Sequence, residues 1–219
     1  MNQLLPTIAR TVVAAATLFA AAASAHAQGD VEAGKKKAEM CIGCHGIPGY
    51  QNSFPEIHKV PKISGQSDKY IVSALTAYKK GERKHPTMRG IAGSLSDQDM
   101  ADLGAFYASH ADKAAAETPK APNEVVKALL EKGACASCHG ANFSKPIDPS
   151  YPKLGGQHAD YLFVALKSYT VEGNPYVGRS NGIMAGIAKQ YKPSEMREIA
   201  KYLSTLDGEL KTVPQSRFR

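Results

Sequence analysis

Two short motifs of identical spacing constrain this chain more than any other feature of its sequence. In each motif two cysteines stand three positions apart, and a histidine follows the second one at once. The residues are Cys41, Cys44 and His45 in the first motif, and Cys135, Cys138 and His139 in the second. At this spacing two cysteines on one helical turn bond the vinyl groups of a haem, and the histidine ligates its iron. The sequence therefore predicts two covalently attached haem c groups.

The cysteines have two other interpretations. Two Cys-x-x-Cys pairs could form a zinc site, or each pair could be a redox dithiol. Neither explains why a histidine follows both pairs, and a structural zinc site usually brings its pairs closer together in sequence. The chain has four cysteines, so the two motifs leave none for a disulfide. Haem attachment accounts for every residue of both motifs.

The first residues have the pattern of a secretory signal peptide. Arg10 precedes an apolar run over 11–23, and Ala25 and Ala27 form the small-x-small pattern of a cleavage site. The run is shorter than the ~20 apolar residues that a membrane-spanning helix needs. We expect residues 1–27 to be removed on export to the periplasm, the compartment of c-type haem attachment in bacteria. A retained membrane anchor is the alternative.

The mature chain has the form of a tandem duplication with a period of roughly 90 residues. Residues 61–66 read Pro-Lys-Ile-Ser-Gly-Gln, and residues 152–157 repeat them as Pro-Lys-Leu-Gly-Gly-Gln. A tyrosine-led helical pattern follows each segment, at 70–78 and at 161–169. The predicted division is an N-terminal domain over 28–113, a linker over 114–122 and a C-terminal domain over 123–219.

Both halves carry amphipathic helical patterns. Ile71, Ala74, Leu75 and Tyr78, for example, are spaced three and four apart on one helix face. No segment alternates apolar and polar residues for long enough to predict a sheet. We therefore expect an all-α protein of two tandem domains, each with a few helices around one haem and almost no sheet.

The sixth ligand of each iron separates an electron carrier, with both axial positions filled, from a catalyst, with one open. Met88 and Met184 are the preferred candidates, because each is expected in a polar loop that could reach the haem face opposite the histidine. Met40 adjoins the first cysteine, while Met100 and Met196 lie in helical patterns typical of core methionines. Two His/Met pairs would raise both reduction potentials relative to bis-histidine ligation.

Histidine is the rival sixth ligand. His85 lies three residues before Met88, but the corresponding residue of the second repeat is Asn181. Three further histidines also lack a counterpart in the other repeat: His58, His110 and His158. His85 therefore remains open as an alternative ligand of the first haem.

Supporting groups follow from the needs of a bound haem. Each proximal histidine needs an acceptor for its second ring N–H, and the carbonyls of Pro61 and Pro152 are candidates. The haem propionates need donors. Candidate donors are Gln66, Gln157, Arg83, Arg179 and the tyrosines of the two helical patterns. Those tyrosines could equally be core residues.

The formal net charge of +7 is weak evidence for a nucleic-acid or membrane-surface partner. Haem propionates would offset part of this charge, and the lysines and arginines form no long run. We expect no nucleic-acid partner.

These motifs together resemble the dihaem cytochrome c4 family. The resemblance rests on the two haem motifs, the repeated Pro-Lys segments, the tyrosine-led helices and an arginine five residues before each methionine, and it covers nearly the whole mature chain. It implies two class I cytochrome c folds related by a pseudo-twofold axis, with neighbouring haems. The residues implied are Cys41, Cys44, Cys135 and Cys138 for attachment, and His45, Met88, His139 and Met184 as iron ligands.

The resemblance also implies electron delivery in the periplasm from an upstream donor towards a membrane terminal oxidase, through transient docking. We therefore expect an electron carrier with no catalytic residues of its own. The alternative is a dihaem oxidoreductase, or its electron-transfer subunit, that acts on a sulfur compound or peroxide with one labile distal ligand. The loops after His45 and at 173–178 depart from the family pattern and leave the partner's identity open.

Overall fold

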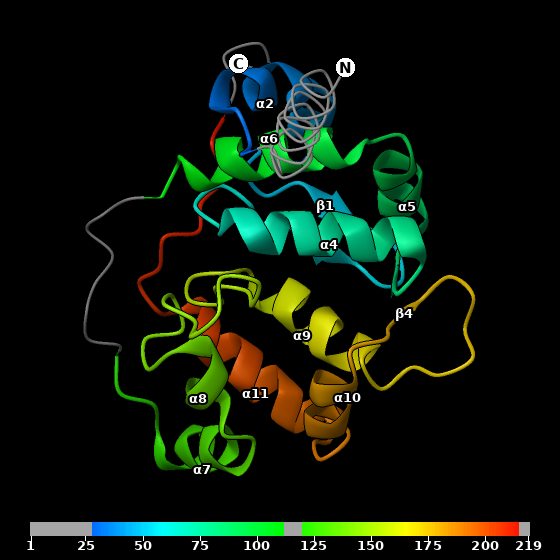
Figure 1. The fold of residues 1–219 in the computed structure, drawn as a ribbon. Coiled ribbons are helices and arrows are strands. Elements are labelled where there is room, and N and C mark those ends of the chain that lie inside the picture. Colours follow the sequence, from blue (N-terminus) through cyan, green and yellow to red (C-terminus); the bar gives the residue numbers. More distant parts are fainter. Residues whose placement is uncertain (1–27, 112–119, 215–219) are drawn as a thin grey trace, which may run out of the picture.

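The computed structural model describes residues 28–111 and 120–214 (Figure 1). The expected signal peptide and most of the expected linker lie outside the described residues. Figure 1 shows the N-terminal half above the C-terminal half. The helices of the first half are α2 (Val31–Lys37), α3 (Glu39–His45), α4 (Asp68–Lys80), α5 (Pro86–Gly93) and α6 (Asp97–Ala108). Those of the second are α7 (Glu124–Lys132), α8 (Cys135–His139), α9 (Ala159–Ser168), α10 (Gly182–Ala188) and α11 (Pro193–Ser204).

Polar side chains set where several of these helices begin. Asp30, Ser67 and Asn123 each accept a hydrogen bond from a backbone N–H in the first turn of α2, α4 and α7. Ser96 and Asp99 form a reciprocal capping box at the start of α6. Gly81 ends α4 in the left-handed conformation with φ 76°. Local sequence signals therefore account for most boundaries of the first half.

Each half packs around its own apolar core. In the first half α6 contacts both α2 and α4, and in the second α11 contacts both α9 and α7. Met100 and Leu103 of α6 are almost fully buried, as are Met196 and Ile199 at the corresponding positions of α11. The methionines of these two helices are core residues, as their helical pattern predicts.

The strands are very short, in agreement with the all-α prediction. They are β1 (Gln51–Asn52), β2 (His58–Lys59), β3 (Arg83–Lys84) and β4 (Gly178–Arg179). Strands β1 and β2 pair within the first half. Strands β3 and β4 pair antiparallel across the two halves, with Arg83 opposite Arg179. This small ladder joins the repeats beside the functional site.

The segment after α11 returns to the N-terminal half, where Figure 1 shows it in red. The backbone N–H of Lys211 donates to the carbonyl of Ser64 at 3.0 Å. Gly65 has φ 86°, and a Cβ there would lie 2.0 Å from the carbonyl oxygen of Glu209. The carboxylate of Glu209 in turn pairs with the ammonium group of Lys153. The end of the described chain therefore lies tightly against the first domain.

Within residues 28–111 and 120–214, no helix combines the length and the apolar character needed to cross a bilayer.

Candidate functional site

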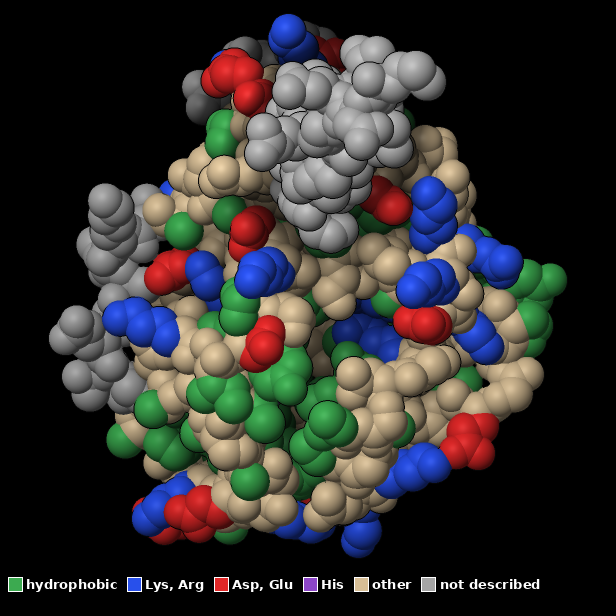
Figure 2. Space-filling model, in the orientation of Figure 1, with side chains coloured by type: hydrophobic (Ala, Val, Ile, Leu, Met, Phe, Trp, Pro, Cys, Tyr) green, Lys and Arg blue, Asp and Glu red, His purple; other side chains and the backbone are tan. Residues whose placement is uncertain are grey.

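The two motifs and the two candidate methionines line one cavity of about 1010 Å³. Its walls come from both halves and are mostly apolar, with Leu75, Leu103, Leu162 and Leu203 among them. Ligand cavities commonly measure about 300–1,000 Å³, so this one lies at the upper limit. Figure 2 shows hydrophobic side chains around a hollow in the C-terminal half, and a second hollow between the halves with Lys or Arg side chains at its floor.

Helix α3 places the first motif against this cavity. Cys41 and Cys44 lie one turn apart and are partly buried. The Nδ1–H of His45 donates to the carbonyl of Pro61 at 2.8 Å, which leaves Nε2 free to ligate a metal. Burial lowers the pKa of His45 and favours the neutral imidazole that a metal requires.

Helix α8 repeats this arrangement in the second half. The Nδ1–H of His139 donates to the carbonyl of Pro152 at 3.0 Å, and burial lowers its pKa as well. Cys135 and Cys138 are again partly buried and one turn apart. The structure therefore confirms both prolines as the acceptors expected from the sequence.

Met88 and Met184 line the same cavity, but their local structure corrects an expectation. Each was expected in a polar loop, whereas each lies in the first turn of a short helix, α5 or α10. The helices form because the side chain three residues earlier accepts a hydrogen bond from the methionine N–H. His85 does so for Met88 at 3.5 Å and Asn181 for Met184 at 3.0 Å.

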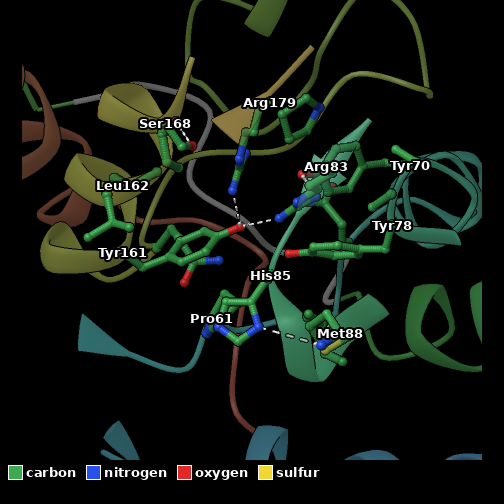
Figure 3. A pocket seen from close by; sticks show the side chains of 18 of the residues that line it. Pro61, Tyr70, Tyr78, Arg83, His85, Met88, Tyr161, Leu162, Ser168 and Arg179 are labelled. Atoms are coloured by element: carbon green, nitrogen blue, oxygen red, sulfur yellow. Dashed lines mark hydrogen bonds between the residues drawn. The ribbon is translucent and has the colours of Figure 1, made fainter. Parts of the chain in front are cut away.

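The caps also explain why His85 of the first half corresponds to Asn181 in the second. His85 and Asn181 occupy the same N-cap position in the two halves. Asn52 of β1 contacts the other ring nitrogen of His85 at 3.1 Å. Both ring nitrogens of His85 therefore face donors of the protein, of which a neutral imidazole accepts from one, and Figure 3 shows the imidazole beside Met88. Capping could have been recognised from the sequence, because Asn and His both carry acceptors at this spacing from the methionine.

The two glutamines expected as propionate donors have another role. Gln66 exchanges two hydrogen bonds with the backbone of Lys153, at 3.0 and 3.1 Å. Gln157 does the same with the backbone of Lys62, at 2.9 and 2.8 Å. Both amides are buried. The repeated Pro-Lys segments therefore join the two halves through these reciprocal pairs.

Arg83 and Arg179 meet in the cavity between the halves (Figure 3). Both donate to the hydroxyl of Tyr161, at 2.6 and 3.2 Å. Burial alone would raise the pKa of Tyr161, but the two guanidinium groups outweigh burial and lower it to about 8. Neither arginine forms an ion pair with a carboxylate among the described residues. The Nε of Arg83 is buried without a hydrogen-bond partner.

These observations fit haem in three respects. The cavity is large and mainly apolar, as a macrocycle requires. Each half contributes a one-turn cysteine pair and an oriented, neutral histidine. Two partly buried cations without carboxylate partners among the described residues, one with a buried and unsatisfied N–H, suit the propionates that a haem carries.

Comparison with known proteins agrees with this fit. The Cytochrome c family model matches residues 31–111 and again 124–207. Cytochrome c4 of Stutzerimonas stutzeri is 32% identical over 197 residues, covering 83% of this chain and 91% of that protein. The crystal structure of reduced recombinant cytochrome c4 from Pseudomonas stutzeri matches with a TM-score of 0.62 and 29% identity, over 81% of this chain and 99% of that one.

A further relative is the thiosulfate dehydrogenase electron acceptor of Stutzerimonas stutzeri (strain A1501). It is 29% identical over 183 residues, which cover 77% of this chain and 80% of that protein.

Fold and site thus define a c-type cytochrome with two covalently bound haem c groups, a protein that transfers electrons. Within that class, the chain belongs to the cytochrome c4 family.

Proposed function

We propose that this protein carries single electrons on two haems with His/Met ligation. Cys41 and Cys44 attach the first haem, and His45 and Met88 ligate its iron. The second haem is attached by Cys135 and Cys138 and ligated by His139 and Met184. The observation that carries the proposal is that each half presents one carbonyl-oriented histidine and one helix-terminal methionine to the same cavity.

Filled axial positions make a haem a reversible one-electron site. The chain's own contribution is to keep those positions filled and unchanged. The Pro61 and Pro152 carbonyls orient the histidine rings. The caps of α5 and α10 fix the backbone of the methionines. The apolar walls exclude water. No catalytic residue is required for this function.

We place the protein in the periplasm, with residues 1–27 removed and with domains over 28–113 and 123–219 joined by 114–122. The secretory pattern of the first residues and the compartment of haem attachment support this location. Its partners are redox proteins: an upstream donor and an acceptor such as a membrane terminal oxidase. The family supports a carrier role, and the departing loops bear on which partner docks.

A second function has one specific observation in its favour. The similarity to a thiosulfate dehydrogenase electron acceptor favours a donor that oxidises a sulfur compound. In that function the chain is an electron-transfer subunit or, with one labile distal ligand, an oxidoreductase. Both halves retain a helix-terminal methionine at the cavity, which supports the carrier over the oxidoreductase.

The ligands can be tested with Met88→Ala and Met184→Ala in the exported holoprotein. Each variant should convert one haem from low-spin to high-spin, let that haem bind carbon monoxide and lower its potential, because thioether ligation favours ferrous iron. Met40→Ala is the matched control, since Met40 adjoins the first cysteine but is 49% exposed. Its spectrum should equal that of the wild type.

Low-spin haems that ignore carbon monoxide in either methionine variant would refute that methionine as a ligand. Carbon monoxide binding by the unaltered protein would favour the oxidoreductase.

A further inference from the structure

Two arginines that correspond in the repeats have different surroundings. Both side chains are partly buried and line the cavity between the halves, on strands that pair directly. Two like charges in a buried site repel each other and each carries a desolvation cost. The contacts of each arginine side chain therefore show which half of the protein its charge lies against.

Arg83 contacts both halves. Its Nη1 donates to the hydroxyl of Tyr70 in its own half at 3.1 Å, and its Nη2 donates to Tyr161 of the other half at 2.6 Å. Its guanidinium also lies 4.6 Å from the ring centre of Tyr78. The hydroxyls of Tyr70 and Tyr161 correspond in the repeat, so Arg83 joins the two equivalent positions.

Arg179 contacts tyrosines of the second half. It donates to Tyr161 at 3.2 Å and lies 5.8 and 5.3 Å from the ring centres of Tyr161 and Tyr169. The bond from Arg179 to Tyr161 is the counterpart of that from Arg83 to Tyr70 within the first half. The counterpart of the Arg83 bond to the opposite half would join Arg179 to Tyr70, and the hydrogen bonds of the described residues do not include it. The pseudo-twofold relation of the halves is therefore broken at this pair.

Arg83 also lies at the ligand region of the first half. Its side chain lines the same cavity as His45 and Met88. In a buried site, a charge acts over longer distances than in water. A positive charge favours the reduced state of a nearby haem, because reduction adds an electron.

We propose that Arg83 is shared by the two haem sites and sets the reduction potentials of both, whereas Arg179 acts mainly on the haem of the C-terminal half. This inference rests on the proposed haem ligation, with one haem in each half. On this inference, the charge that acts on both haems belongs to a residue of the N-terminal half.

The test is a spectroelectrochemical titration of the holoprotein with Arg83→Gln and Arg179→Gln. Arg83→Gln should lower both midpoint potentials by similar amounts. Arg179→Gln should lower that of the C-terminal haem at least about twofold more than the other, since the effect of a charge falls with distance. Arg197→Gln is the control, because Arg197 is exposed, stacks 3.7 Å from the ring centre of Phe163 and is not among the residues that line the cavity. It should leave both potentials unchanged.

Met184→His in each background assigns the two waves, because a histidine in place of a methionine lowers the potential of that haem alone. If this marker moves neither wave, the proposed ligation fails. The Arg83 inference is still decided, because the number of waves that Arg83→Gln moves is counted without the marker. If Arg83→Gln moves one wave only, the inference is overturned.

Arg83→Lys keeps the charge and should restore both potentials most of the way to the wild-type values. Potentials like those of Arg83→Gln would contradict a role of charge.

If Arg83→Gln yields no folded holoprotein, Tyr161→Phe replaces it. Made in the Arg179→Gln background and compared with it, this variant keeps the ring and removes only the acceptor that holds Arg83 to the second half. The C-terminal potential should then shift more than the N-terminal one. Unchanged potentials in Tyr161→Phe would overturn the inference.

Discussion

At the scale of single residues, Asp102 is a buried acid that joins α6 to both ends of α2. It is 2% exposed and accepts hydrogen bonds from the backbone N–H of Asp30, from the side chain of Gln98 and from the ammonium of Lys37. Burial alone would raise the pKa of Asp102, but these donors outweigh it and lower the pKa. The ionised carboxylate is therefore part of the native structure.

Asp102→Ala should lower the free energy of unfolding by about 3 kcal/mol, because the variant removes the partner of a charge and leaves buried donors unpaired. Denaturant unfolding of the oxidised holoprotein measures the change. Asp97→Ala, at an exposed position of the same helix, is the control and should cost at most about 0.5 kcal/mol.

The same carboxylate predicts a dependence on pH. The pKa of Asp102 is lower in the folded chain than in the unfolded one, so its contribution is present above about pH 4 and is lost as the pH falls through the folded value. The difference in stability between the wild type and Asp102→Asn should therefore shrink below about pH 4. A difference that stays constant down to pH 2 would contradict an ionised Asp102.

Residue types alone indicated the haem-attaching cysteines, the histidines and the carbonyl acceptors. They did not indicate Asp102 or the interdomain use of Gln66 and Gln157, because each depends on a contact between segments far apart in sequence. Nor did they indicate that the Nε of Arg83 lacks a hydrogen-bond partner, because this results from its burial between the two halves. Spacing along the chain carries no signal for burial of that kind.

At the scale of elements, the crossing of α2 over α6 depends on Gly34. A Cβ at this position would lie 2.0 Å from the carbonyl oxygen of Asp102 and 2.8 Å from the Cβ of Phe106. The carbonyl of Asp102 belongs to the backbone of α6, so it cannot move aside as the end of a flexible side chain could. The two helices therefore approach more closely than any residue but glycine allows.

Gly34→Ala should lower the free energy of unfolding by about 2 kcal/mol or more through overpacking of this crossing. Gly90→Ala is the matched control in α5, since a Cβ there meets nothing within 4 Å. The control should stabilise the protein by up to about 1 kcal/mol, because alanine loses less entropy in a helix than glycine. Equal stability of the two variants would refute a crossing that requires glycine.

Most helices could be predicted from their apolar spacing and caps, including those that begin after Asp30, Ser67 and Ser96. The short helices that carry Met88 and Met184 were missed, because proline and glycine, which disfavour helix, supply three of eight residues in α5 and two of seven in α10. The pairing of β3 with β4 was missed because two-residue strands have no alternation to detect.

At the scale of the whole molecule, the reciprocal glutamine pairs couple two domains that each have a separate core. Gln66 and Gln157 make four hydrogen bonds to the opposite half, and the ammonium groups of Lys62 and Lys153 add one each, to Gly156 and Gly65, both at 2.7 Å. The interface therefore includes a polar component, as interfaces between domains of one chain often do.

The double variant Gln66→Ala/Gln157→Ala should separate the unfolding of the two halves. Each substitution should cost about 2 kcal/mol of coupling, because two hydrogen bonds are lost per glutamine. Differential scanning calorimetry should show one transition for the wild type and two for the variant. Gln190→Ala, exposed and bonded within its own half at 3.3 Å, should retain a single transition. One transition in the double variant would show that other contacts couple the halves.

The return of the chain's end to the first domain has a consequence for biogenesis. Ser64 and Gly65 lie next to the first histidine's carbonyl acceptor, and they are covered by residues 209–211. A chain that crosses a membrane from its N-terminus delivers both cysteine motifs before this covering segment. In the proposed exported chain, the first domain can therefore receive its haem before residues 209–211 contact Ser64 and Gly65.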